Sequence, residues 1–362
     1  MRPAPAAPLP IVPRYLLREV LRTFLTSLGG LSLFLVPPAA LSALHKLGGV
    51  GPEVLVGYLP LLAAQLLPHL VPIAFLLGIT RCAAGLVARR EWLALEMSGR
   101  HPLRTLVPVA VVALGMSLLS LAVLHRELPA LRYDQAAYQR DAAVEAARRS
   151  LVGRTAISLG GFHVVGQSLD ETGIRDALVR LDQDELGAEG EYLIVDHLTI
   201  TPRAGELDLD LTGVRLLNGS SSGQLRLSVP FDRILRVKKP DPEKPKYLTS
   251  DQVAARLEAG LPDAKPRWRL EYELARRTAL SATYLVFALG GVLMGLRLAT
   301  ESVLGPLGAT IGLAGVHHVL YQQVGRDLVL SGQAPAWLGA WLANGVLLAV
   351  FVLVVATRRW RR

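Results

Sequence analysis

The sequence has a single cysteine, Cys82, so no disulfide can form within the chain. Charged residues make up only 19% and aromatic residues 6%, whereas 51% are hydrophobic, and soluble domains usually contain about 25% charged residues. No G-x-x-x-x-G-K-[ST] motif occurs, which excludes nucleotide hydrolysis by the P-loop route. No H-E-x-x-H motif or Cys/His cluster occurs either, so we predict neither a metal site nor a catalytic residue. What remains is the composition of long apolar helices.

The net charge of +9 does not indicate nucleic acid as a partner, because the arginines gather at the ends of apolar runs. There they would meet lipid headgroups and cytosol, and no basic stripe with interleaved aromatics occurs. Residues 1–13 are rich in proline, and we predict them to be disordered. Arg14, Arg18 and Arg22 then precede an apolar stretch that is too long for the core of a signal peptide, so we predict an uncleaved first span.

Six windows lack charged residues and approach or exceed the roughly 20 apolar residues that cross a bilayer as a helix. They are residues 23–45, 54–80, 105–124, 278–296, 302–325 and 335–357. The fourth window is the shortest, and we predict that its helix begins near Leu274. The prediction is a polytopic α-helical membrane protein with six spans, in membrane domains 14–125 and 274–362.

The short connections differ in basic residues, and this difference predicts orientation. The connection between the second and third spans is rich in arginine, as are both ends of the chain, whereas the alternate short loops hold only Lys46 and Arg326. We therefore predict that both termini are cytoplasmic and that residues 126–273 form a domain on the opposite side. This domain divides the spans into three and three.

Within 126–273 the pattern changes from helix to strand. Residues 127–150 are predicted to be a charged helix that continues the third span. Leucines alternate with charged or polar residues at 206–211 and 224–229, which indicates strands with one buried face, joined by a turn at 218–223. Thr249 and Gln252 have the spacing of a capping box at the start of a short helix.

Polar residues within the apolar windows are candidates for a cavity, since polar groups that face lipid are costly. Gln65 and His69 share one face of the second span, and His317 and Tyr321 share one face of the fifth. The alternative is that they only form interhelical hydrogen bonds. The further candidates for lipid contact are Phe34 in the first span and His45 and Lys46 at its outer end, where Lys46 attracts a lipid phosphate or is an ordinary interfacial anchor. Two G-x-x-x-G pairs, Gly291/Gly295 and Gly308/Gly312, predict close helix packing within the chain or across a dimer.

The connection between the second and third spans contains a predicted short helix at about 88–99. Its apolar residues are Trp92, Leu95 and Met97, and it ends at Gly99. A helix at this position docks into the groove of a partner protein or rests on lipid headgroups.

A resemblance to a known family rests on motifs in order along nearly the whole chain. Residues 91–99, Glu-Trp-Leu-Ala-Leu-Glu-Met-Ser-Gly, are similar to a coupling helix of the form S-E-[IL]-x-x-[ML]-x-A-[SC]-G. Glu91 and Gly99 are in register, Arg90 replaces the frequent serine, and Met97 and Ser98 stand in place of Ala-Ser or Ala-Cys. Segments 14–19, 66–78, 273–291 and 335–344 resemble the opening and the second, fourth and last spans. The chain is similar to the LptF/LptG family, the transmembrane subunits of the lipopolysaccharide-export ABC transporter.

This resemblance implies a β-jellyroll for the periplasmic domain, a location in the cell inner membrane and a heterodimer of two homologous permeases. It also implies a cytoplasmic LptB ATPase dimer, which binds the ATP and Mg that this chain does not, and the periplasmic jellyroll proteins LptC and LptA. The coupling helix, with Arg90, Glu91, Trp92, Leu95, Met97, Ser98 and Gly99, would contact the ATPase. Lys46 corresponds roughly to basic residues that meet lipid phosphates, although residues 23–44 lack the further lysine of the family.

Two other functions stay open at this point. The first is a scaffold that uses the same ATPase coupling to signal without moving lipid. The second is a membrane-embedded hydrolase, for which Gly219-Ser-Ser-Ser-Gly223 matches G-x-S-x-G literally. A nucleophile elbow requires a helix after the motif, and a second strand is predicted there instead, so a turn is favoured.

Overall fold

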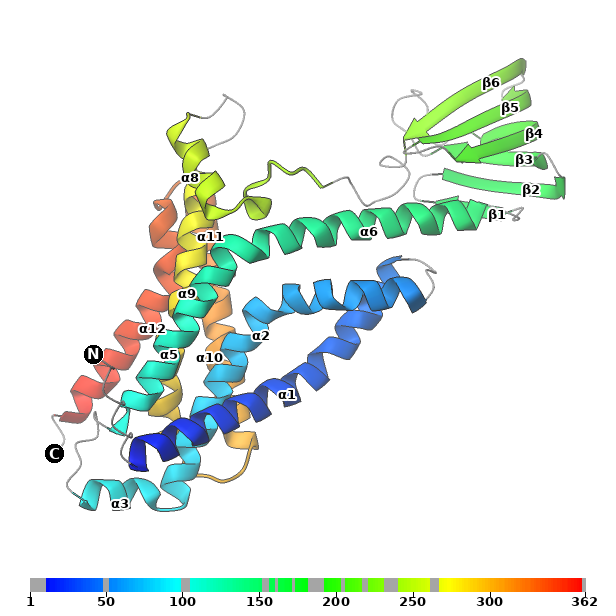
Figure 1. Cartoon of the computed structure of the whole chain (residues 1–362). Helices are drawn as coiled ribbons and strands as arrows, with labels where there is room; N and C mark the ends of the chain where they lie inside the picture. Colours follow the sequence, from blue (N-terminus) through cyan, green and yellow to red (C-terminus); the bar gives the residue numbers. More distant parts are fainter. Residues whose placement is uncertain are drawn as a thin grey trace, which may run out of the picture. The chain divides into compact units, whose positions relative to one another are not determined.

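The computed structural model describes residues 11–47, 52–98, 105–151, 156–159, 162–170, 173–181, 192–202, 206–216, 221–230, 240–260 and 267–359. The chain divides into two compact units. The helical unit comprises Met1–Pro38, Leu62–Arg132 and Pro242–Arg362, and the sheet unit comprises Ala39–Leu61 and Tyr133–Asp241. The elements of both are labelled in Figure 1.

Helices make up most of the described chain. The long ones are α1 (Ile11–Leu47), α2 (Pro52–Ala88), α5 (Val107–Ala122), α6 (Leu128–Leu151), α9 (Arg267–Leu298), α10 (Leu304–Val319) and α12 (Ala336–Arg359), and the short ones are α3 (Glu91–Met97), α8 (Ser250–Glu258) and α11 (Arg326–Leu330). Two π-helical turns, η1 (Val123–Glu127) and η4 (Leu320–Gly325), and the 3₁₀ turn η3 (Pro245–Tyr247) complete the set. Residues 105–151 are thus helical almost throughout, which confirms the predicted helical extension of the third span.

Five described helical stretches are long and apolar enough to cross a membrane: Ile11–Ser42, Gly57–Ala88, Val107–Ala142, Arg267–Leu298 and Ala336–Thr357. The remaining predicted window, 302–325, is divided. Helix α10 ends after 16 residues, and the chain continues without a break through η4 and α11. A π-helical turn replaces i→i+4 hydrogen bonds with i→i+5 bonds, a change that apolar patterning does not mark. The several apolar helices are confirmed, whereas the number six remains a prediction.

Two helix starts differ from prediction. The first helix begins at Ile11, so residues 11–13 of the segment predicted to be disordered are helical, and residues 1–10 lie outside the described residues. Helix α9 begins at Arg267 rather than near Leu274. Its first turns are polar, but Leu270 packs against Leu248 and Val253 of the α8 region, and this tertiary contact extends the helix. The predicted capping box of α8 is present.

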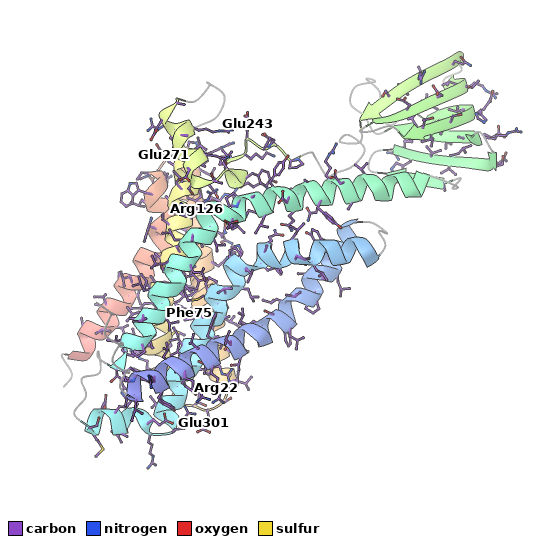
Figure 2. The ribbon with its side chains drawn as sticks, in the orientation of Figure 1. Arg22, Phe75, Arg126, Glu243, Glu271 and Glu301 are labelled. Atoms are coloured by element: carbon purple, nitrogen blue, oxygen red, sulfur yellow. The ribbon has the colours of Figure 1, made fainter. Side chains whose placement is uncertain are left out.

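Aromatic contacts join three helices of the helical unit. The Phe75 ring of α2 lies edge to face with Phe24 of α1 and with Tyr284 of α9, with ring centroids 5.9 and 5.5 Å apart. Figure 2 labels Phe75 within the bundle. The two G-x-x-x-G pairs have different surroundings. A Cβ atom added at Gly295 of α9 would lie 2.5 Å from the Thr80 carbonyl oxygen of α2, whereas no described atom lies within 4 Å of such an atom at either glycine of the α10 pair.

The described strands form one antiparallel sheet of six strands in sequential order. The strands are β1 (Ala156–Leu159), β2 (Phe162–Asp170), β3 (Gly173–Leu181), β4 (Tyr192–Pro202), β5 (Glu206–Leu216) and β6 (Ser221–Pro230). Leu209 of β5 pairs with Leu227 of β6, and Leu207 pairs with Val229, as the alternating pattern predicts. The predicted turn at 218–223 is shorter, since β6 begins at Ser221, and residues 217–220 lie outside the described residues.

A row of breaks in the strand ladders crosses the sheet. The ladders between β3, β4 and β5 omit Asp176, Asp196 and Gly213, which lie in register, and Asp176 and Gly213 have φ angles of 50° and 70°. At these breaks two successive side chains of each strand face outwards, so the alternation shifts by one residue while the strands keep the same register on both sides. The buried residues of the inner face are Val164, Ile174, Ala177, Val179, Leu193, Val195, Leu198, Leu209, Leu211 and Val214. A two-sheet jellyroll remains a prediction.

Candidate coupling helix and polar cavity

The short helix α3 follows α2 after a tight turn. Helix α2 ends at Ala88, and Arg90 adopts the left-handed region with φ 61° before α3 begins at Glu91. A non-glycine residue in this region costs of order 1 kcal/mol and persists only where its surroundings hold it. Trp92 and Glu91, the first two residues of α3 to have partners elsewhere in the helical unit, hold the chain after this turn.

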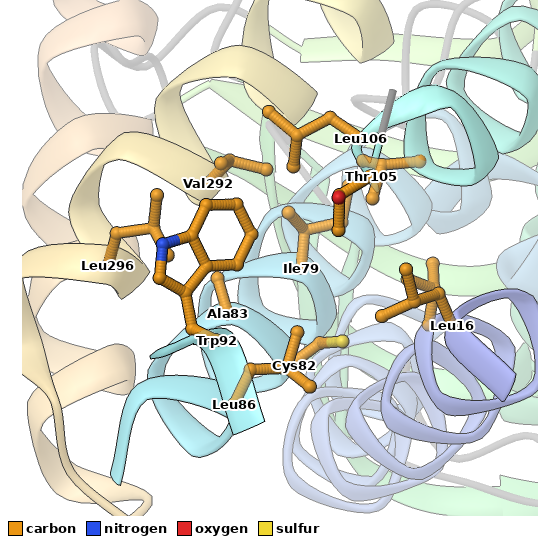
Figure 3. A pocket seen from close by; sticks show the side chains of 12 residues that line it. Leu16, Ile79, Cys82, Ala83, Leu86, Trp92, Thr105, Leu106, Val292 and Leu296 are labelled. Carbon is orange, nitrogen blue, oxygen red and sulfur yellow. The ribbon is translucent and has the colours of Figure 1, made fainter. Parts of the chain in front are cut away.

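Trp92 anchors α3 to the helical unit. Its indole lines a small apolar pocket together with residues of α1, α2, α5 and α9, and Figure 3 shows it beside Val292 and Leu296. The pocket has a volume of only about 20 Å³, which is room for about one water molecule. The indole N–H is satisfied by Glu96, at 2.9 Å. The pocket therefore accommodates the packing of Trp92 and is too small for a ligand.

Glu91 is held by partners that sequence reasoning missed. The Tyr15 hydroxyl of α1 donates to its carboxylate at 2.7 Å, and the Arg89 guanidinium lies 3.0 Å away. Arg89 also bonds Glu19, at 3.3 Å. Burial opposes the charge of Arg89, but the hydrogen bond to Glu19 and the Glu91 charge outweigh it, so the pKa of Arg89 is raised. Because Tyr15 precedes Glu91 by 76 positions, no local sequence pattern could predict this contact.

The side of α3 that does not contact the helical unit carries exposed apolar residues. Leu93 and Met97, one turn apart, are 53% and 81% exposed, whereas Leu95 is half-buried. Ser98 caps the end of the helix by donating its hydroxyl to the Leu95 carbonyl at 2.7 Å. The predicted end at Gly99 lies outside the described residues.

A cavity with a mixed polar and apolar wall lies among α2, α9 and the α10–η4 stretch. The structure places His69, His317 and Tyr321 on its wall, with a cavity volume of about 340 Å³. Pro68, Pro72, Ile73, Leu280, Thr283, Phe287, Ala314, His318 and Gln322 complete the lining. Histidines and hydroxyls thus share the wall with aliphatic and aromatic carbon, which suits an amphipathic occupant.

His317 also belongs to an interhelical hydrogen-bond network. Its Nε2 atom lies 3.2 Å from the Asn344 Oδ1 of α12 and 3.4 Å from the Thr283 hydroxyl of α9. The Asn344 amide in turn donates to the Ala279 carbonyl, at 2.6 Å. His317 stacks on Tyr321, with centroids 6.0 Å apart. His317 therefore both lines the cavity and takes part in interhelical hydrogen bonds, and its role in lipid contact stays a prediction.

The other candidates for lipid contact do not join this cavity lining. Phe34 is exposed on α1, and Gln65 is exposed on α2. The backbones of His45 and Lys46 belong to α1, but their side chains lie outside what the structure describes. Their roles remain predictions.

A buried ionic cluster at the start of the α9 apolar stretch was not singled out from sequence. Glu273 receives two hydrogen bonds from Arg276, at 2.8 and 2.9 Å, and one from Arg277, at 3.2 Å, and Arg132 lies 3.9 Å away. Arg277 also donates to Ser250 and to the carbonyls of Pro245 and Leu248. The i, i+3 and i, i+4 spacing within α9 was visible in the sequence, but the partners from 245–250 were not.

These features define a class: a multi-pass helical membrane protein with an inserted antiparallel sheet and a short helix that presents an apolar surface between two spans. Comparison with protein families matches residues 14–357 to "Lipopolysaccharide export system permease LptF/LptG". The chain belongs to the LptF/LptG family, as its motifs predicted, and is a permease subunit of a lipopolysaccharide-export ABC transporter rather than a catalytic enzyme. Membership implies a partner permease and a partner ATPase. A search of curated proteins found no match.

Proposed function

We propose that this chain extracts lipopolysaccharide, or a related amphipathic envelope lipid, from the inner membrane and passes it to a periplasmic β-jellyroll bridge. The observation that carries the proposal is the cavity of His69, His317 and Tyr321, whose mixed polar and apolar wall lies among apolar helices. A lipid with a polar head and apolar chains needs such a wall. The chain has no P-loop, so the energy comes from a separate ATPase that binds ATP and Mg.

The proposed topology has six spans, cytoplasmic termini and a periplasmic sheet unit. The continuous helical run through α10, η4 and α11, from Leu304 to Leu330, supports the sixth span, because it exceeds the roughly 20 residues needed to cross a bilayer. The distribution of arginines supports the orientation. In the sheet unit, the continuous apolar inner face supports a jellyroll-like receptor for acyl chains.

In this proposal α3 is the coupling helix that a cytoplasmic LptB dimer grips. Leu93 and Met97 form the exposed apolar face that enters the groove of the ATPase, a common mode of helix recognition. Glu91 is carried over as an ATPase-contacting position, and its bonds to Tyr15 and Arg89 leave further acceptor capacity on the carboxylate. A homologous permease completes the heterodimer, and LptC and LptA receive the lipid.

Replacing Met97 with aspartate is expected to weaken association with the ATPase about tenfold or more. Burying a methionine side chain contributes about 1.5–3 kcal/mol, and a charge in an apolar groove adds a desolvation cost. Met97→Leu is the matched control and should retain binding. The measurement is copurification and titration of the ATPase with the full-length permease, with thermal unfolding recorded in parallel. Equal binding by Met97→Asp and Met97→Leu would remove α3 from the interface. Glu91→Lys should also weaken binding, but it disrupts the contact with Tyr15 as well.

A photoreactive residue at His318, on the cavity wall, is expected to form adducts with the exported lipid. The same residue at Leu348, exposed on α12 but outside the cavity lining, should label bulk phospholipid only. Mass spectrometry of the adducts separates transport from the scaffold alternative. Identical lipid profiles at the two positions would favour a scaffold.

A further inference from the structure

A second polar pocket lies beside the coupling helix, between the first half of α1 and the ends of α2 and α9. Its volume is about 400 Å³, within the range of small-ligand sites. It is lined by Glu19, Arg22, Thr23, Thr26, Arg81, Gly85, Arg89, Thr300, Glu301 and Ser302. Gly85 lies in the last turn of one apolar stretch, and residues 300–302 follow the end of another, α9, so the pocket is at a boundary between hydrocarbon and water. Figure 2 shows Arg22 and Glu301 at this end of the helical unit.

Most charges of the pocket are already paired. Glu19 is bonded by Arg89 at 3.3 Å and lies 3.6 Å from Arg22. Two charges differ: within the described chain, neither the half-buried Arg81 nor the exposed Glu301 has a hydrogen-bond or ion-pair partner. They line the same pocket without forming an ion pair with each other, so it presents one free cation and one free anion among its described residues.

Hydroxyl groups on the connection between α9 and α10 add hydrogen-bond donors. The Thr300 hydroxyl accepts the Ser302 N–H at 3.1 Å, and the Ser302 hydroxyl accepts the Leu304 N–H at 3.3 Å. Because both oxygens act as acceptors in these bonds, both O–H groups remain available as donors. Arg81 and two hydroxyls can therefore bind the oxygens of a phosphate, while Glu301 can bind an ammonium group.

Exposed apolar residues adjoin the pocket. Leu25 of α1, next to Thr26, is 61% exposed, and Leu304 at the start of α10 is 77% exposed. A headgroup in the pocket would let its acyl chains run along such side chains towards the hydrocarbon. A soluble phosphate compound would gain nothing from them.

We propose that this pocket binds a phospholipid with a zwitterionic headgroup, a phosphate followed by a primary amine, of the phosphatidylethanolamine type. Arg81, Thr300 and Ser302 bind the phosphate, and Glu301 binds the ammonium. The site is distinct from the cavity of the exported lipid, and it does not depend on the identity of that lipid. Basic pockets among membrane helices are known to recognise anionic headgroups, and the free carboxylate here changes the preference.

The test is native mass spectrometry of the full-length protein in detergent, titrated with phosphatidylethanolamine, phosphatidylglycerol, phosphatidylcholine and soluble phosphoethanolamine. Arg81→Gln is expected to weaken phosphatidylethanolamine and phosphatidylglycerol about tenfold, since each loses a charge-assisted hydrogen bond. Glu301→Gln should weaken phosphatidylethanolamine about fivefold and leave phosphatidylglycerol unchanged or tighter. Arg297→Gln, at the same helix end but outside the pocket lining, is the matched control and should change neither.

Three results would overturn the proposal. The first is that the protein binds the three lipids with equal affinity and that Arg81→Gln does not change this affinity. The second is binding of soluble phosphoethanolamine as tightly as the lipid, which would identify a site for free phosphate compounds. The third is a photoreactive residue at Thr26 that crosslinks only to protein in native membranes, which would identify an acidic partner segment instead.

Discussion

Replacing Gly295 with alanine is expected to destabilise the permease by about 3 kcal/mol or more, at the upper end of overpacking costs. The added Cβ would lie 2.5 Å from the Thr80 carbonyl oxygen, 2.6 Å from the Ala83 Cβ and 3.0 Å from the Ala84 nitrogen. Two of these atoms are backbone, so no rotamer change relieves the contact. Helix α9 must move away from α2, and the aromatic contact between Phe75 and Tyr284 must loosen with it.

The matched control is Gly308→Ala, in the second G-x-x-x-G pair. No described atom lies within 4 Å of the added Cβ, and alanine is the better helix former by about 1 kcal/mol. Thermal unfolding of the purified protein should therefore show a large loss for Gly295→Ala and no loss for Gly308→Ala. Equal midpoints for the two variants would mean that α9 and α2 do not meet as described. A loss in Gly308→Ala alone, in the assembled complex, would place that pair at an interface between subunits.

Arg277→Met is expected to cost about 3–5 kcal/mol of stability, as for a broken buried ion pair. Arg277 is only 2% exposed and donates to Glu273, to the Ser250 hydroxyl at 3.0 Å and to the carbonyls of Pro245 and Leu248 at 3.1 and 2.8 Å. Methionine has similar length but no donor, so the two carbonyls and the hydroxyl lose a partner. Glu273 keeps Arg276, and the damage should therefore concentrate on the segment that leads into α8.

Hydrogen exchange of α8 amides, together with thermal unfolding, checks this expectation. The control is Arg267→Met on the same helix. Arg267 also pairs with a glutamate one turn away, Glu271 at 2.8 Å, but its side chain is exposed, so the loss should stay below about 0.5 kcal/mol. If amide exchange in α8 becomes faster in Arg277→Met but not in Arg267→Met, the hydrogen bonds of Arg277 hold residues 245–250 against α9. Unchanged exchange in both variants would show that α8 is held by its apolar contacts alone.

Elements with a strong local signal were predictable from sequence. Strands β5 and β6 follow from leucine alternation, and the start of α8 follows from Thr249 and Gln252, because each signal is contained within a few residues. The start of α9 was missed because contacts with the α8 region, not local composition, extend the helix to Arg267. The breaks in the strand ladders were not predicted, because Asp176 adopts the left-handed conformation although it is not a glycine.

In the candidate sites, too, the features with a local sequence signal were predictable and those that depend on distant contacts were not. Amphipathic spacing located α3 and the shared face of His317 and Tyr321, and the family motif located Glu91. Sequence could not show that Glu91 binds Tyr15 or that Asn344 completes the network of His317, since these pairs are 76 and 27 positions apart. Nor could it distinguish the G-x-x-x-G pair that packs against α2 from the pair on α10.

The π-helical turn η4 has a consequence for comparing this chain with its relatives. A π turn contains one residue more than an α turn, so every side chain after it is rotated by about 100° relative to an unbroken helix. Gly325, in η4, lies against the Gly339 backbone of α12 in that rotated frame. A relative that lacks this one residue and continues as a plain α-helix would present the same flank to α12, but each of its later positions would correspond to the next position in this chain. An alignment with a relative must therefore account for this extra residue at 320–325 before one infers which later side chains face α12.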